Sequence, residues 1–145
     1  MITGYIRGAG RLKTHESAEN YLETILALSN NGNQVRSIDI VNELDYSKPS
    51  VSIAMKNLRE KGYVIVDDDG YITLTKTGRK IAESVYERHM MISDWLIFLG
   101  VDRNTAVNDA CRMEHAMSEQ SFSAIKTHIE SWKRDIYSHK NKDKK

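Results

Sequence analysis

The sequence has little of what stabilises small secreted domains or anchors membrane proteins. Its 145 residues include one cysteine and one proline, which excludes a disulfide framework and favours a reducing compartment. No apolar run approaches the roughly 18 residues of a membrane span, and the chain does not open with a signal-peptide pattern. At this length a core can form without cross-links. We therefore expect a soluble, cytoplasmic, globular protein with no membrane partner.

The chain also lacks a strong excess of charge of either sign. Its formal net charge is +1, from 21 basic and 20 acidic residues, whereas nucleic-acid-binding domains are usually basic. The charge is unevenly distributed, because residues 1–14 carry +3 and residues 133–145 carry +4, while residues 81–132 carry −4. The near-neutral total therefore arises from cancellation between segments.

Apolar spacing predicts a mainly α-helical protein. In chain order it indicates helices over about residues 17–29, 37–44, 47–61, 75–99 and 103–117, and from 118 onward. Two short β-type runs, 63–66 and 71–74, are joined by an Asp-Gly turn that is typical of a hairpin. Ser37 is a candidate N-cap for the second helix. Ser47 begins the third, with Pro49 in its first turn.

The order helix, short helix, helix, hairpin over residues 17–80 is the layout of a winged helix-turn-helix. Such a domain places its third helix in the DNA major groove. Residues 47–61 suit that role because they hold four basic residues and one acidic residue. The candidate DNA-binding residues are Ser47, Lys48, Pro49, Ser50, Ser52 and Lys56. The same layout also serves in protein-interaction modules.

The sharpest chemical motif is Cys111-Arg-Met-Glu114-His115. On a helix these positions share one face, and a thiol, a carboxylate and an imidazole are all ligands for transition metals. The alternative is a buried cysteine beside a solvated Glu-His pair. The first and fourth predicted helices offer further ligands. A site among the three helices would collect Asn20, Glu23, His89, Cys111, Glu114 and His115.

Four short sequence motifs, called phrases below, resemble those of a known protein family. They are Glu19-Asn-Tyr-Leu-Glu-Thr-Ile-Leu, Lys48-Pro-Ser-Val-Ser, Leu74-Thr-Lys-Thr-Gly and Asn108-Asp-Ala-Cys-Arg-Met-Glu-His. Together, over about residues 16–137, they resemble the diphtheria-toxin-repressor family of metal-dependent transcriptional repressors. The fold class implied is mainly α, with an N-terminal winged helix-turn-helix followed by a C-terminal helical dimerisation domain.

These patterns predict four segments. A flexible arm over residues 1–15 precedes the winged-helix domain at 16–75. A linking helix with the metal-binding and dimerisation domain follows at 76–138, and a disordered basic tail ends the chain at 139–145. The resemblance implies a homodimer on a palindromic double-stranded DNA operator. Its candidate dimer surface on the sixth predicted helix is Phe122, Ile125, Ile129 and Trp132.

The resemblance also implies a ligand set. The length resembles that of the short, manganese-sensing branch, whose ligand positions are matched by Glu23, His89, Glu114 and His115. Asn20 stands where that branch has Asp, and Cys111 matches the iron-sensing branch instead. Ser93 and Val107 stand at ligand positions of that branch's ancillary site. The set is therefore a hybrid of the two branches.

The donor chemistry favours one metal over the other. A soft thiolate prefers Fe(II), Co(II), Ni(II) or Zn(II) to the harder Mn(II). We therefore expect a divalent transition metal, with Fe(II) favoured over Mn(II) and other divalent metals binding in vitro. Bound between the first, fourth and fifth predicted helices, it would promote repression of metal-homeostasis genes.

Other functions stay open from the residues alone. A winged-helix regulator could sense a small organic ligand or oxidation of Cys111, and a helical metalloenzyme could use the same ligands. The sequence has no Gly-rich phosphate loop, no Gly-x-Ser-x-Gly and no His-Glu-x-x-His. We therefore expect that the protein is not an enzyme and that it binds no organic cofactor.

Overall fold

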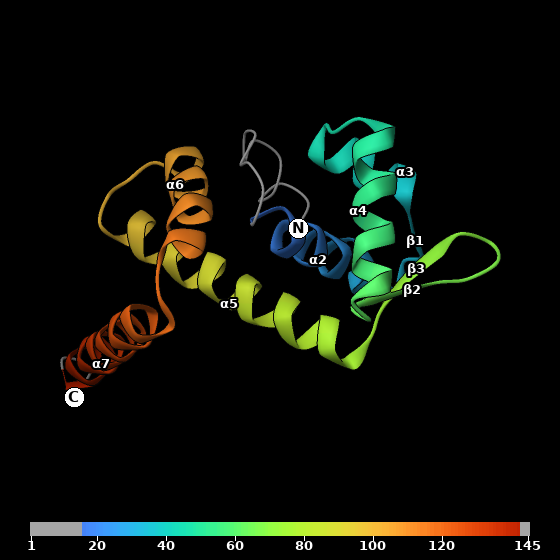
Figure 1. Ribbon diagram of the computed structural model, residues 1–145. Coiled ribbons are helices and arrows are strands. Elements are labelled where there is room, and N and C mark those ends of the chain that lie inside the picture. Colours follow the sequence, from blue (N-terminus) through green and yellow to red (C-terminus); the bar gives the residue numbers. More distant parts are fainter. Residues whose placement is uncertain (1–15, 143–145) are drawn as a thin grey trace. The chain divides into compact units, whose positions relative to one another are not determined.

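The computed structural model describes residues 16–142, which form mainly α-helix with a small β-sheet (Figure 1). Two compact units divide between Glu87 and Arg88, inside a helix. The expected arm over residues 1–15 and the end of the expected tail, residues 143–145, lie outside the described residues. The elements are α2 (Glu16–Ser29), β1 (Val35–Arg36), α3 (Ser37–Leu44), α4 (Lys48–Glu60), β2 (Val64–Val66), β3 (Tyr71–Leu74), α5 (Lys76–Phe98), α6 (Arg103–Ala116) and α7 (Glu119–Lys142).

The first unit packs α2, α3 and α4 with an antiparallel sheet in the order β1-β3-β2. Strands β2 and β3 form the predicted hairpin, in which Ile65 pairs with Thr73. Strand β1 was not predicted, because a strand of two residues cannot show an alternating pattern. It pairs Val35 with Ile72. The predicted winged helix-turn-helix is confirmed.

The core of this unit forms where apolar stripes of the helices meet the sheet. Each buried aliphatic side chain contributes about 1.5–3 kcal/mol relative to an exposed one. On α4, the apolar stripe of Val51, Met55 and Leu58 is buried. The remainder of the core includes Leu22, Ile25, Ile40, Val64 and Ile72. Because α4 buries this stripe, its opposite face is turned to solvent.

The tight turn between α3 and α4 depends on local backbone chemistry. Asp45 has a φ of 54°, in the left-handed region, and it ends α3. Ser47, where the sequence predicted the helix to begin, is the N-cap of α4, and its Oγ accepts a hydrogen bond from the backbone N–H of Ser50 at 3.2 Å. Pro49 occupies the first turn, where its missing N–H costs no hydrogen bond. The start of α4 is therefore fixed by its own sequence.

The predicted cap of α3 is wrong by one residue. Ser37 is the first residue of the helix, and Arg36 occupies the N-cap. The backbone N–H of Arg36 donates to the Asp39 carboxylate at 2.8 Å. The shift arises because β1 runs directly into α3, so no separate capping loop precedes the helix.

The start of α5 is fixed against the turn that follows α4. The Thr75 hydroxyl donates to the Gly62 carbonyl at 2.7 Å and accepts from the backbone N–H of Gly78 at 3.1 Å. The backbone N–H of Thr75 donates to the Tyr63 carbonyl at 3.0 Å. Thr75 therefore caps α5 at the position where the sequence predicted the helix to begin. The close approach of α5 to Tyr63 also explains the glycine of the Leu-Thr-Lys-Thr-Gly phrase. A Cβ at Gly78 would lie 2.0 Å from the Tyr63 carbonyl oxygen.

In the second unit, the helix ends are set by glycine and by capping side chains. Gly100 has a φ of 99° and follows the end of α5. Asp102 caps α6 through hydrogen bonds from the Thr105 hydroxyl at 2.6 Å and its N–H at 3.1 Å. These bonds from Thr105 lower the pKa of the exposed Asp102 carboxyl. The Ser118 Oγ accepts from the backbone N–H of Ser121 at 3.1 Å and so starts α7.

Helix α7 is longer than the sequence indicated. It runs to Lys142, so residues 139–142 of the segment predicted as a disordered tail are helical.

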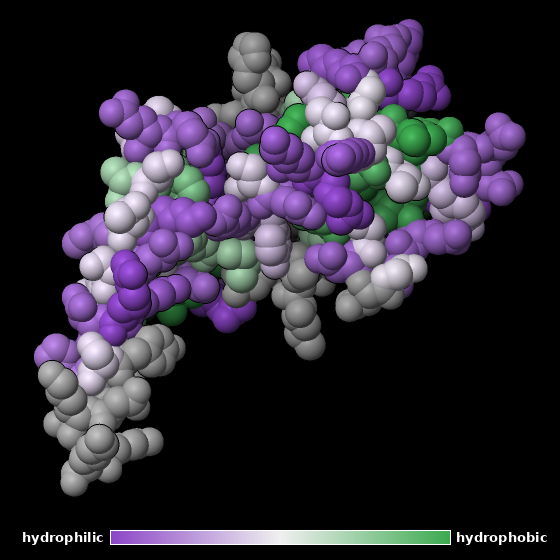
Figure 2. Space-filling view, turned by 90° about the horizontal axis from the view of Figure 1, so that it is seen from below, coloured by the Kyte–Doolittle hydropathy of each residue, from purple (hydrophilic) through white to green (hydrophobic). Residues whose placement is uncertain are grey.

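Hydrophilic residues cover most of the face seen in Figure 2, and hydrophobic surface shows there in separate patches. Among residues 16–142, no helix is both long enough and apolar enough to cross a membrane.

Replacing Gly78 with alanine should destabilise the protein. Alanine favours a helix over glycine by about 1 kcal/mol, but its Cβ would overlap backbone atoms of Tyr63. Overpacking of this kind costs about 1–3 kcal/mol, so we expect a lower denaturant midpoint for Gly78→Ala. Lys80→Ala, at an exposed position of the same helix, is the control. A Gly78→Ala protein as stable as the parent would contradict the close packing.

Candidate functional site

Three side chains that can act as metal ligands converge in the second unit. One ligand atom each of His89 on α5 and of Cys111 and Glu114 on α6 lie within 4.8 Å of one another, and all three residues are buried. Atoms bound 2.0–2.3 Å from one ion can be separated by at most about 4.6 Å. The three donors therefore need only a small adjustment to share one ion. The imidazole, thiolate and carboxylate set suits a transition metal.

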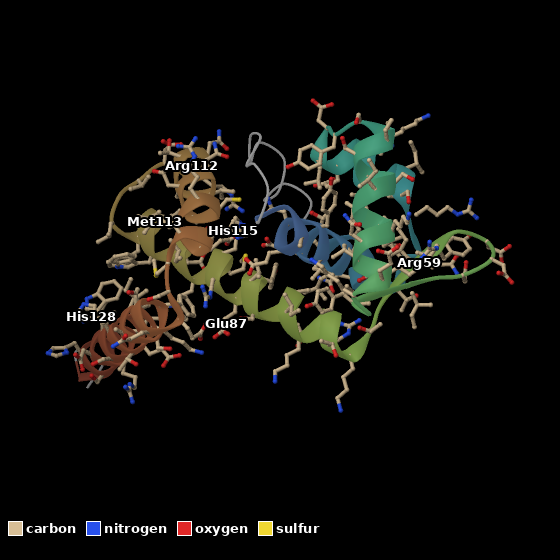
Figure 3. All side chains as sticks on the ribbon, in the orientation of Figure 1. Arg59, Glu87, Arg112, Met113, His115 and His128 are labelled. Atoms are coloured by element: carbon tan, nitrogen blue, oxygen red, sulfur yellow. The ribbon has the colours of Figure 1, made fainter. Side chains whose placement is uncertain are left out.

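The Glu114 carboxylate lies between two imidazoles. Its Oε2 is 3.1 Å from His89 Nδ1, and its Oε1 is 3.2 Å from His115 Nε2. Glu114 is 2% exposed, and a buried carboxylate is costly unless a hydrogen bond, an ion pair or a metal compensates it. Figure 3 places His115 on α6. The side chain predicted as the fourth ligand of this unit therefore lies against the same cluster.

The remaining predicted ligands, Asn20 and Glu23, belong to the first unit. They lie one helical turn apart on α2, and both are buried. The backbone carbonyl of Asn20 accepts a hydrogen bond from the Thr24 hydroxyl at 2.7 Å. Their part in a metal site stays a prediction.

The two residues at the positions of the ancillary metal site, Ser93 and Val107, do not supply the ligands that such a site would need. Val107 is buried and has no ligand atom in its side chain. Ser93 is fully buried and offers a neutral hydroxyl, which has no hydrogen-bond partner among the described residues. These two side chains do not provide the charged donors that a second divalent ion would need.

Sequence reasoning missed Arg88, which immediately precedes His89 on α5. Its guanidinium donates to the carbonyls of Glu114 at 3.3 Å and Met117 at 3.2 Å, and it pairs with the Glu119 carboxylate. Its Cζ lies 4.9 Å from the centroid of the Phe122 ring. No sequence motif marks this residue, since its partners are 26 to 34 positions away.

The predicted DNA-contacting residues all lie on the solvent face of α4 or at its N-cap. Each of Ser47, Lys48, Pro49, Ser50, Ser52 and Lys56 is exposed. The Ser47 and Ser50 hydroxyls form a hydrogen bond of 2.8 Å. Figure 3 places Arg59 farther along α4. Sequence reasoning missed Ile53, which is 63% exposed and lies almost opposite the buried stripe.

The four residues of the predicted dimer surface differ in their exposure within one chain. Phe122 and Ile129 are buried, while Ile125 and Trp132 are half-buried. Their part in a dimer stays a prediction. The exposed apolar side chains of this unit include Phe98 and Leu99 at the end of α5. The Phe98 ring meets the Trp132 ring edge-on, with centroids 4.1 Å apart. A groove of about 310 Å³ beside them is lined by Asp94, Trp95, Phe98, Ile129, Trp132, Lys133 and Ile136.

Family models match both parts of the chain. Residues 13–72 match the N-terminal DNA-binding domain of iron-dependent repressors. Residues 75–143 match the metal-binding and dimerisation domain of the same family. The boundary between the two matches falls just before α5 begins at Lys76.

Individual relatives agree with these matches. The chain is 32% identical over 120 residues to an uncharacterized HTH-type transcriptional regulator of Methanocaldococcus jannaschii, covering 81% of this chain and 96% of that protein. It is 33% identical over 106 residues to the diphtheria toxin repressor of Corynebacterium diphtheriae, covering 72% and 47%.

A solved structure agrees as well. The manganese regulator SloR superimposes with a TM-score of 0.70 at 26% identity, covering 78% of this chain and 53% of that one. This chain thus spans about half the length of SloR and of the diphtheria toxin repressor. A winged helix, a buried ligand cluster and two family matches in the same order lead to one conclusion: the chain belongs to the iron-dependent repressor family of metal-dependent transcriptional regulators.

Proposed function

We propose that this chain represses transcription as a homodimer when a divalent transition metal binds at His89, Cys111 and Glu114. The observation that carries the proposal is this buried cluster in one unit of a chain whose other unit is a winged helix. His115, Glu23 and Asn20 are proposed as further ligands. The proposed role is binding rather than catalysis.

We propose Fe(II) as the preferred metal, ahead of Mn(II). The names of the relatives point both ways, since the matching family is called iron-dependent and SloR is a manganese regulator. The Cys111 thiolate supports the softer ion. An uncharged amide at Asn20 also supplies less negative charge than the aspartate that the family resemblance would place there. Other divalent metals should bind in vitro.

The proposed control of DNA binding follows from where the ligands lie in the chain. When bound, the ion supplies a double positive charge and a fixed coordination geometry. His89, Cys111 and Glu114 hold it from the second unit, while Asn20 and Glu23 are the proposed ligands of the first. Ligation from both units would restrict their relative motion and favour the DNA-binding arrangement. Such coupling is typically about 1–3 kcal/mol, or about 5–150-fold in affinity.

Removing a ligand should abolish the response to metal. We expect Cys111→Ala and Glu114→Ala to lose metal-stimulated binding of DNA from the protein's own promoter region in a gel-shift assay. The dimer should survive, as measured by light scattering. His139→Ala is the matched control, because this exposed imidazole lies outside the cluster. Chelation should reverse binding by the parent protein.

Other outcomes would favour other functions. DNA binding that ignores chelator but responds to peroxide would indicate a sensor of Cys111 oxidation. Binding that ignores both would indicate an organic ligand. Metal-dependent hydrolysis or redox turnover without DNA binding would indicate a metalloenzyme.

We propose that α4 reads a palindromic operator. A two-fold dimer places two copies of α4 on half-sites about 34–36 Å apart. Lys48 and Lys56 supply charge for the phosphates, and small serines at the start of α4 let the helix approach base edges. Ile53 projects a branched alkyl group from the middle of this polar face. Its natural counterpart in the groove is the thymine methyl group.

This assignment can be tested with single methyl groups. Operator DNA is first selected from a random pool with the metal-loaded protein, and each thymine is then replaced by deoxyuridine. One replacement per half-site should weaken DNA binding by the parent protein about 3- to 10-fold, which corresponds to the free energy of one or two small apolar contacts. Ile53→Ala should bind the two DNAs equally.

The matched control is Lys56→Ala. It should bind every sequence more weakly and with a smaller salt dependence, because it loses a phosphate contact. It should keep the parent's sensitivity to the thymine methyl. If Ile53→Ala is still as sensitive as the parent to every uracil replacement, Ile53 does not read thymine.

We propose that a second copy of the chain covers the apolar face at Phe98, Leu99 and Trp132. The surface lies in the part of the chain that matches a dimerisation domain. Leu99 is 60% exposed, so Leu99→Glu disturbs little inside one chain but would bury a charge in an interface.

We therefore expect Leu99→Glu to be monomeric in analytical ultracentrifugation and to lose operator binding. Ile65→Glu provides the control, because Ile65 is similarly exposed, at 58%, but lies on β2 of the first unit. A dimer that is unchanged in Leu99→Glu would place the interface elsewhere.

A further inference from the structure

One side chain fixes the candidate metal ligands and the start of α7 at the same time. Arg88 is only 15% exposed although it is charged, and its donor groups are directed at the junction between α6 and α7. Glu119, its carboxylate partner, is 75% exposed. The arginine is therefore held within the fold, and its role cannot be that of an ordinary surface ion pair.

The first set of contacts closes the end of α6. The Glu114 and Met117 carbonyls belong to the last turn and the C-cap of that helix. Such terminal carbonyls have no partner within the helix and carry its partial negative charge. A guanidinium satisfies both requirements with one group, because it presents several N–H donors in a rigid plane.

These contacts act directly on a proposed metal ligand. Glu114 is held at both ends by consecutive residues of α5. His89 Nδ1 lies 3.1 Å from its carboxylate, and Arg88 donates to its backbone carbonyl at 3.3 Å. The second contact fixes the height of the Glu114 backbone against α5, and with it the position from which the carboxylate extends.

The second set of contacts reaches α7. Arg88 pairs with Glu119 in the first turn of that helix and stacks on Phe122, which is buried one turn later. A cation over an aromatic ring contributes about 0.5–2 kcal/mol. A displacement of the last turn of α6 relative to α5 must therefore alter the contacts that hold α7.

We propose that Arg88 is a positioning residue that preorganises the metal site and transmits its occupancy to α7. The inference rests on the proposed metal site and adds a residue outside the ligand set. It also gives α7, which contributes Trp132 to the proposed dimer face, a direct physical link to the ligands. Lysine cannot replace this function fully, because a single ammonium cannot bridge two carbonyls, a carboxylate and a ring.

The test uses Co(II) as a spectroscopic probe of the full-length protein. Binding at Cys111 should produce a thiolate-to-cobalt charge-transfer band, and its titration against a competing chelator gives the affinity. Arg88→Ala should weaken Co(II) binding about 10- to 100-fold, as is typical when a group supporting a metal ligand is removed. Arg88→Lys should fall between this variant and the parent. Arg134→Ala, which removes an exposed arginine of α7, should stay within about twofold of the parent.

Hydrogen exchange tests the link to α7. In the parent protein, Co(II) should slow amide exchange over residues 118–125, and in Arg88→Ala this protection should disappear even at saturating metal. Glu119→Gln keeps the two carbonyl contacts. It should therefore bind Co(II) within about threefold of the parent and yet lose protection at α7. A merely structural arginine would change exchange equally with and without metal.

The outcomes separate this inference from the proposed function. If the parent protein gives no thiolate-to-cobalt band, the metal site is wrong and the role of Arg88 falls with it. If the parent gives the band and Arg88→Ala binds Co(II) equally well, Arg88 alone is refuted. Should Arg88→Ala fail to fold, Arg88→Lys decides: parental affinity and parental protection of α7 would overturn the proposal.

Discussion

The arrangement of the second unit depends on one carboxylate that has been removed from water. Isolated ionised groups are too costly to bury unless they are paired or bind a metal. Glu114 meets this requirement with an imidazole on each side, one from α5 and one from α6. With Cys111 beside it, the cluster offers thiol, carboxylate and imidazole groups, and a divalent cation bound there would compensate the buried carboxylate. The same constraint therefore explains both the packing and the proposed function.

Two contacts away from the cluster determine where α5 lies in each unit. At its start, Gly78 allows the helix to contact the Tyr63 carbonyl, and Thr75 caps it there. Beyond the division between the units, Arg88 holds the end of α6 beside the same helix. The helix that carries His89 is therefore fixed by the hydrogen bonds of Thr75 at its start and by the Arg88 guanidinium near its middle. Each arrangement is local to its own unit.

Much of the fold and of the candidate site could be predicted from the sequence, because these features depend on residues that are close together in the chain. The capping residues Ser47 and Thr75 and the Asp-Gly hairpin each act within a few positions, and so does the spacing of Cys111 and Glu114. The features that the sequence did not reveal depend on contacts between residues that are far apart in the chain. Strand β1 is too short to show a period, and Arg88 finds its partners on other helices. Phe122 and Ile129 follow the same helical spacing whether a stripe faces its own core or a second chain, so periodicity alone does not show that both are buried within one chain.

The near-neutral charge of the chain bears on how such a protein would select DNA. Uniformly basic proteins bind any duplex, because phosphate contacts carry no sequence information. Here residues 47–61, around α4, carry a local charge of +3, the two ends of the chain are also basic, and residues 81–132 carry −4. A cation held by the acidic part would raise the net charge at the moment that it restrains the ligands. Non-specific attraction would then stay weak without metal, and apolar and hydroxyl contacts from α4 would decide which sequence is bound.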